Sequence, residues 1–98
     1  MDLDKTTKIQ IEKEDLDNLY FPAEEILTDR AAKKERTQAL HRSASLGNLE
    51  KHKVHITFAD IEGAKEVFTT IWAVTENKVV LKGGRVIPVN RIISVNFS

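Results

Sequence analysis

The stretch Lys78-Val-Val-Leu-Lys-Gly-Gly-Arg-Val-Ile-Pro-Val-Asn-Arg-Ile92 contains the signals that decide the fold. The aliphatic, β-branched run over 78–82 favours a strand, and Gly83-Gly84 is a two-residue hairpin signal. Residues 85–89 read as the returning strand, and Pro88 restricts its end to a sheet edge or a bend. The stretch therefore predicts a β-hairpin followed by a short turn at Asn90-Arg91.

The residues before the hairpin also follow a β pattern. Alternate apolar residues from Val54 to Phe58 share one face of a strand, and residues 60–63, Asp-Ile-Glu-Gly, read as a turn. Residues 65–75 carry β-branched and aromatic side chains on both faces, which predicts a long, bent strand shared between two packed sheets. With a last strand over 92–97, five short strands predict a small antiparallel barrel over residues 53–98.

The core of this barrel should consist of apolar residues at alternating or central strand positions. For the single tryptophan, Trp72, a core position is favoured over an exposed one that could stack on a base. The expected core residues are Val54, Ile56, Phe58, Phe68 or Trp72, Ile71, Val74, Val80, Ile87, Ile92 and Val95.

A helix is expected before the strands, over residues 23–47. Pro22 suits its N-terminal boundary, and Gly47 supplies a stop signal. A shorter helix capped by Thr28 is the alternative. The apolar stripe of either helix is thin, so the helix should pack on one side only.

Residues 1–22 are expected to form an acidic N-terminal arm that can be flexible. Residues 1–28 contain eight acidic and three basic side chains, whereas residues 29–53 contain three acidic and seven basic ones. So little apolar surface near the N-terminus favours disorder, although Ile9 and Ile11 alternate and leave a short edge strand open.

The C-terminal half of the chain resembles the Sm-like family of small SH3-like barrels. Leu81-Lys82-Gly83 fits the family's aliphatic-basic-glycine signature between its last two strands, and Gly63 loosely fits its turn glycine. Residues 87–92 resemble the short turn before the last strand of SH3-like barrels. The chain is also similar to small uncharacterised bacterial proteins. The resemblance implies a helix followed by a five-stranded barrel, and it implies self-association through strand edges as an option.

Composition excludes several classes of site. Without cysteine, the chain has neither a disulfide framework nor a thiolate metal site. No apolar run approaches the roughly 20 residues of a membrane-spanning helix, and the N-terminus lacks the pattern of a signal peptide. We therefore expect a cytoplasmic protein without a membrane partner.

Basic residues on the helix and on the barrel rim are the candidate nucleic-acid contacts, because lysine and arginine neutralise phosphates. Ordinary solvated charge is the competing explanation, since the excess of positive charge is small. The candidates are Arg30, Lys33, Lys34, Arg36, Lys82, Arg85 and Arg91.

Neither metal binding nor catalysis is indicated. His52 and His55 straddle the start of a strand, and no carboxylate is obviously placed beside them or His41. The threonines near Trp72 lack an identifiable base. We therefore expect a non-enzymatic binding module without catalytic residues, metal or cofactor. Its ligand is hypothesised to be RNA or single-stranded DNA. The alternative is a protein-interaction or self-association module, such as a homo-oligomer, that does not bind nucleic acid.

Overall fold

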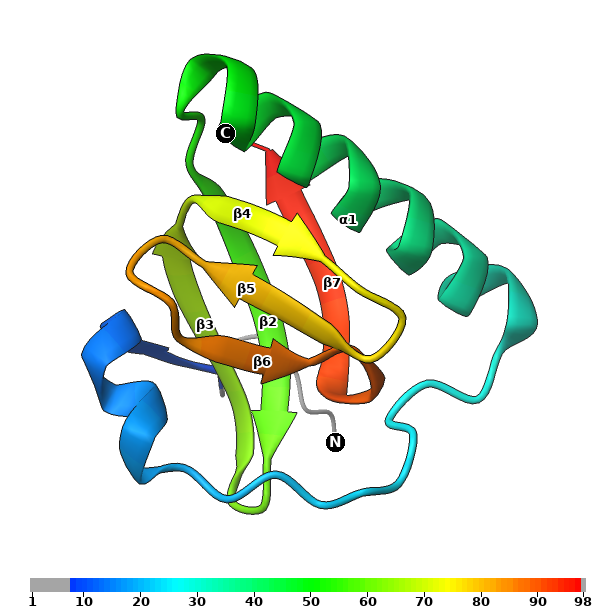
Figure 1. Ribbon diagram of the computed structural model, residues 1–98. Helices are drawn as coiled ribbons and strands as arrows, with labels where there is room; N and C mark the ends of the chain where they lie inside the picture. Colours follow the sequence, from blue (N-terminus) through cyan, green and yellow to red (C-terminus); the bar gives the residue numbers. More distant parts are fainter. Residues whose placement is uncertain (1–7, 98) are drawn as a thin grey trace.

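Two β-sheets and one long helix make up the fold (Figure 1), as seen in the computed structural model, which describes residues 8–97. The larger sheet has the strand order β1-β3-β2-β7 and the smaller sheet the order β4-β5-β6. The helix α1 lies across β4 and β7. The bounds are β1 (Ile9–Ile11), η2 (Lys13–Asn18), α1 (Arg30–Glu50), β2 (Val54–Asp60), β3 (Gly63–Thr69), β4 (Ile71–Val74), β5 (Lys78–Leu81), β6 (Val86–Pro88), η3 (Val89–Arg91) and β7 (Ile92–Phe97).

The predicted long, bent strand is present as β3 and β4, which are separated only by Thr70 and belong to different sheets. The turns at 60–63 and 83–84 also form, and both glycines of the latter have positive φ values. Within the described residues, however, the strands form two sheets and not one closed barrel. β6 pairs only with β5, because the 3₁₀ turn η3 follows it directly and leads the chain into β7.

The core lies between the two sheets and α1, and most of its predicted residues are buried there. Phe68 and Trp72 were wrongly expected to supply a core residue, since their side chains are 44% and 46% exposed. Trp72 lies within β4 at a register irregularity between Ile71 and Ala73, and its side chain faces solvent and not the core. Side chains alternate between the two faces of β5, so Val79 and Leu81 face the core, whereas Val80 lies on the other face and is only half-buried. Val74 is also only half-buried. The core members that the pattern missed are Leu16, Leu40, Val67, Val79 and Leu81.

The helix begins at Arg30, later than the expected residue 23. The Asp29 carboxylate accepts a hydrogen bond of 3.0 Å from the backbone N–H of Ala32, which is the usual role of an N-cap aspartate. Gly47 does not end the helix. It lies inside α1, at a position where a Cβ would lie 2.3 Å from the Ile71 carbonyl oxygen, so the close approach of α1 to β4 requires glycine there. The helix ends instead at Glu50, and the C-cap residue Lys51 has a left-handed backbone conformation.

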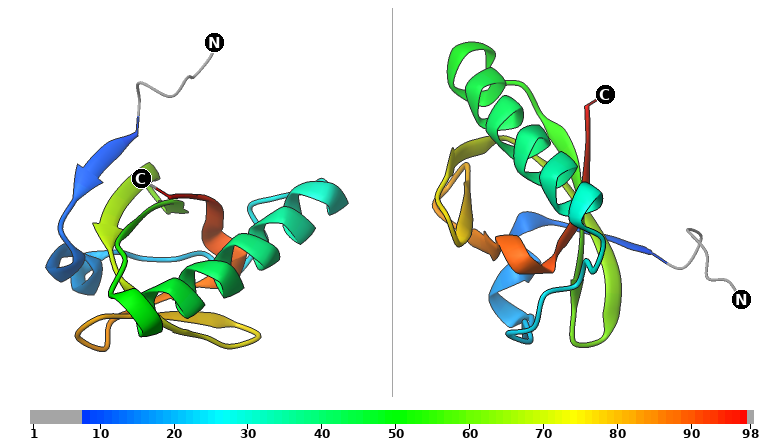
Figure 2. Two further views of the ribbon diagram at one scale, coloured as in Figure 1. Left: turned by 90° about the horizontal axis from the view of Figure 1, so that it is seen from above. Right: turned by 90° about the vertical axis from the view of Figure 1, so that its right-hand side faces the viewer.

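Residues 8–28 begin at the edge of the larger sheet and then pass around the sheets before they reach α1 (Figure 2). The short edge strand considered for Ile9 and Ile11 is present as β1, which pairs in parallel with β3. Leu16 is buried in the core, and the backbone N–H of Ile61 donates to the Tyr20 carbonyl oxygen. In the described part of the chain, no helix has the length and apolar character that a membrane span requires.

Candidate functional site

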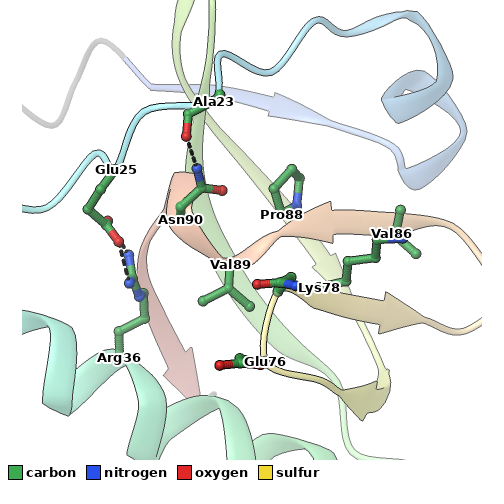
Figure 3. Close-up of a pocket in the computed structure, with 10 residues that line it drawn as sticks. Ala23, Glu25, Arg36, Glu76, Lys78, Val86, Pro88, Val89 and Asn90 are labelled. Carbon is green, nitrogen blue, oxygen red and sulfur yellow. Dashed lines mark hydrogen bonds and ion pairs between the residues drawn. The ribbon is translucent and has the colours of Figure 1, made fainter.

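Arg36, one of the seven candidate contacts, is engaged inside the molecule. Its side chain is buried, and its guanidinium donates two hydrogen bonds of 2.7 and 2.8 Å to the Glu25 carboxylate (Figure 3). It donates a further bond of 3.0 Å to the Ile92 carbonyl oxygen. These hydrogen bonds from Arg36 lower the pKa of Glu25 to about 2. Arg36 thus ties the start of α1 to the segment before it and to β7.

Arg91 and Arg85 also have partners within the chain. Buried Arg91 donates hydrogen bonds to the carbonyl oxygens of Ala59, at 2.9 Å, and Glu24, at 3.0 Å. Arg85 is half-buried and forms an ion pair with Asp17, with a closest N–O distance of 3.1 Å. A nucleic acid would have to compete with these contacts, and burial keeps Arg91 from reaching a phosphate at the surface.

The other four candidates lie in two separate places. Arg30, Lys33 and Lys34 occupy the first turns of α1, whereas Lys82 lies in the turn between β5 and β6. The exposed Trp72 lies beside the far end of α1, where its carbonyl oxygen accepts a bond from Asn48 Nδ2. At a rise of 1.5 Å per residue, the basic start of the helix is about 20 to 27 Å from that point. The basic helix residues and Lys82 therefore do not converge beside Trp72.

A different cluster forms where the chain bends between β3 and β4. The backbone N–H of Lys82 donates to the Thr70 carbonyl oxygen at 2.9 Å, and Val54 pairs with Thr69. Lys82 and Lys53 are thereby brought to opposite sides of the bend. A cavity of about 170 Å³ opens here, which we name the bend pocket. Its lining residues are Glu12, Lys13, Glu14, Lys53, Phe68, Thr69, Thr70 and Lys82.

Cations and an exposed aromatic ring meet in the bend pocket. The Lys53 ammonium group lies 5.6 Å from the centre of the Phe68 ring, within the range of a cation–π contact. Lys13 Nζ donates a bond of 3.0 Å to the Lys82 carbonyl oxygen and retains two further N–H donors. Within residues 8–97, none of these three lysines has a carboxylate within ion-pair distance. The pocket therefore offers unneutralised donors beside a π surface.

Sequence reasoning found only Lys82 of this cluster. Lys13 lies in the acidic arm, Lys53 is isolated between two elements, and Phe68 was expected to be core. The one sequence feature that related these residues was the bend predicted within residues 65–75, because such a bend brings the ends of neighbouring strands together.

A larger cavity of about 570 Å³ lies between α1, the β4–β5 turn and the β6–η3 segment (Figure 3). Pro88 and Val89 give it an apolar floor, and the Glu25–Arg36 ion pair closes one side. Its other polar residues are Glu76, Asn77, Lys78 and Asn90. The lining holds no serine, threonine or cysteine.

His55 has a carboxylate partner that its position in the sequence did not reveal. Its Nδ1 lies 2.6 Å from Glu66 Oε2, across the strands β2 and β3, and its ring stacks on Phe68. Burial of Glu66 opposes its ionisation, but contacts from Lys8, Gln10 and His55 outweigh this effect and hold the pKa of the carboxyl below its usual value. Among the described residues, no group of three or more possible ligands could hold a metal ion.

No protein family, curated protein or solved structure was found to match the chain.

Proposed function

We propose that this protein is a non-enzymatic binding module that binds single-stranded RNA or DNA at the bend pocket. The observation that supports the proposal is the exposed Phe68 ring with Lys53 over it and with Lys13 and Lys82 in the same pocket. We also propose that the two sheets together form an SH3/Sm-like barrel that is left partly open. The protein is further proposed to be cytoplasmic.

The chemistry of this cluster suits a single strand. His55 already stacks on the Phe68 ring, so a base has to stack on the part of the ring that stays exposed, a contact worth about 1–3 kcal/mol, while lysines attract the adjacent phosphates. Trp72 is a second exposed ring, four residues from Phe68 and thus at most about 13 Å along the chain. An exposed ring beside several cations suits recognition that depends more on stacking and charge than on base sequence.

The first turns of α1 become a secondary surface in this proposal. Arg30, Lys33 and Lys34 can add long-range attraction, but the described residues place no exposed aromatic ring beside them. Such a surface can contribute to the rate and salt dependence of binding without fixing the position of a base.

Fluorescence anisotropy with a labelled single-stranded oligonucleotide tests the proposal. Binding should weaken steeply between about 50 and 200 mM salt, because phosphate contacts release counterions. Phe68→Ala should weaken binding about tenfold at fixed salt, whereas the matched control Tyr20→Ala removes an exposed ring elsewhere and should leave it unchanged. Absence of binding to RNA and DNA at about 50 mM salt contradicts the proposal.

Self-association without nucleic-acid binding is the second candidate function. It is favoured by β7, a six-residue edge strand without charged residues or proline, because such an edge can pair with another strand. By contrast, β1 and β6 have three residues each, and β6 contains Pro88. Light scattering at high protein concentration tests this alternative, and a monomeric mass argues against it.

A further inference from the structure

The acidic residues of the bend pocket limit which part of a strand it can hold. Glu12 and Glu14 line the pocket beside the three lysines, and both belong to the η2 region, which also contains Asp15 and Asp17. Three lysines and two glutamates thus line the pocket. This balance attracts one phosphate group but repels a second phosphate that would lie over η2.

The other direction out of the pocket is more favourable for a polynucleotide. Phe68 lies at the rim, and the chain continues from it through the bend to the exposed Trp72. Lys51 and Lys53 belong to the connection from α1 to β2, and Figure 1 shows this connection on the other side of the β3–β4 bend from η2. A strand can therefore leave the pocket across Phe68, whereas it cannot continue past the carboxylates without charge repulsion.

Two buried threonines and one fixed lysine suit a site that holds a single phosphate group in one position. Thr69 and Thr70 are 5% and 4% exposed and belong to the bend itself. Lys13 Nζ is held at 3.0 Å from the Lys82 carbonyl oxygen, and this contact positions an ammonium group across the β5–β6 turn. A tetrahedral oxyanion can accept hydrogen bonds from several ammonium groups at once, and such charge-assisted bonds are the strong ones.

From this arrangement we propose that the bend pocket binds the terminal phosphate of a single-stranded nucleic acid, with the adjacent base stacked on Phe68. This inference rests on the proposed function and specifies its ligand as a phosphorylated strand end. A terminal phosphate suits this lining better than an internal one, because a strand that ends in the pocket has no further phosphate to place over the carboxylates of η2.

The test compares decamers of one mixed sequence that carry an internal fluorescent label and differ only at their ends. One has a 5′-phosphate, one a 3′-phosphate, and one has hydroxyl groups at both ends. At about 100 mM salt, one of the phosphorylated strands should bind about tenfold more tightly than the hydroxyl strand. Which of them is preferred gives the polarity of the bound strand.

Variants locate the effect in the bend pocket. Lys13→Gln and Lys82→Gln should each reduce the preference for the phosphorylated end severalfold, whereas Lys34→Gln on α1 should leave the preference unchanged. The double variant Glu12→Gln, Glu14→Gln should bind the hydroxyl strand more tightly, because that strand can then continue over η2. The ratio of the affinities for the phosphorylated and the hydroxyl strand should therefore fall. Thermal melts check that each variant is folded.

Equal binding of all three decamers, with Lys82→Gln weakening each of them equally, overturns the terminal-phosphate site but leaves nucleic-acid binding in place. If none of the decamers binds even at about 50 mM salt, the proposed function fails and the inference fails with it.

Discussion

The first turns of α1 and the bend pocket both bring basic side chains together, but from different parts of the sequence. On α1 the residues are close neighbours between Arg30 and Arg36, whereas the pocket draws Lys13, Lys53 and Lys82 from three distant segments. On the helix, the Arg36 side chain is buried and its guanidinium is hydrogen-bonded to Glu25. In the pocket the lysines lie beside an exposed ring. The comparison teaches that the partners of a basic residue, more than the local density of charge, decide whether it can bind a ligand.

Removal of Arg36 should have the largest effect on stability. Arg36→Met leaves Glu25 and the Ile92 carbonyl oxygen without their donor, so the free energy of unfolding should fall by about 3 kcal/mol or more. The matched control Lys34→Met, two residues away on the same helix and exposed, should change it by less than about 0.5 kcal/mol. Urea unfolding measures both values. If both variants lower the free energy of unfolding by the same small amount, Arg36 is an ordinary surface charge like Lys34.

The same ion pair predicts a pH dependence. Because the folded-state pKa of Glu25 is about 2 and its ordinary value is 4.5, the pair stabilises the fold fully above pH 4.5. This stabilisation is lost as the pH falls from 4.5 towards 2, and it should amount to about 2 kcal/mol after screening by solvent. Urea unfolding over this pH range should show the loss in the natural protein and a flatter profile in Arg36→Met. Parallel profiles would contradict the role of the pair.

Two double variants compare the two basic regions in binding. Lys53→Gln with Lys82→Gln should weaken the binding of a single-stranded oligonucleotide about tenfold, or about 1.4 kcal/mol. Lys33→Gln with Lys34→Gln removes the same charge and should weaken it about twofold, because only long-range attraction is lost. Anisotropy titrations at one salt concentration give both ratios. A larger loss from the helix pair would move the site to α1.

The smallest effect is expected from a conservative change of the exposed tryptophan. Trp72→Phe should alter the free energy of unfolding by about 0.5 kcal/mol or less, because the side chain is 46% exposed. Unfolding followed by circular dichroism measures this change. A loss comparable to that of a core truncation, about 2–5 kcal/mol, would return Trp72 to the core.

The strand pattern was largely predictable because it depends on local signals. Gly83-Gly84 and the turn at 60–63 define hairpins by their own chemistry, and alternation identified Ile56 and Ile92 as buried. The exposure of Trp72 was not predictable, because it depends on an irregular register with β5. The start of α1 could have been read from Asp29, since aspartate is a preferred N-cap, but Pro22 gave a competing signal.

The candidate site was less predictable than the fold. The density of basic residues suggested Arg36, yet its buried position follows from contacts with Glu25 and Ile92 that only the folded chain brings together. The bend pocket combines residues 13, 53 and 82, and nothing in their local sequence relates them. Sites of this kind depend on long-range contacts, which residue periodicity does not contain.

Chemical-shift mapping tests most directly the claim that the bend pocket is the nucleic-acid site. In a titration of the ¹⁵N-labelled protein with an unlabelled single-stranded oligonucleotide, the largest changes should occur in the amides of residues 68–72 and of Lys53 and Lys82. The indole N–H of Trp72 should shift with them, and residues 30–36 should change little. Shifts concentrated in residues 30–36, with the bend unaffected, would contradict the account.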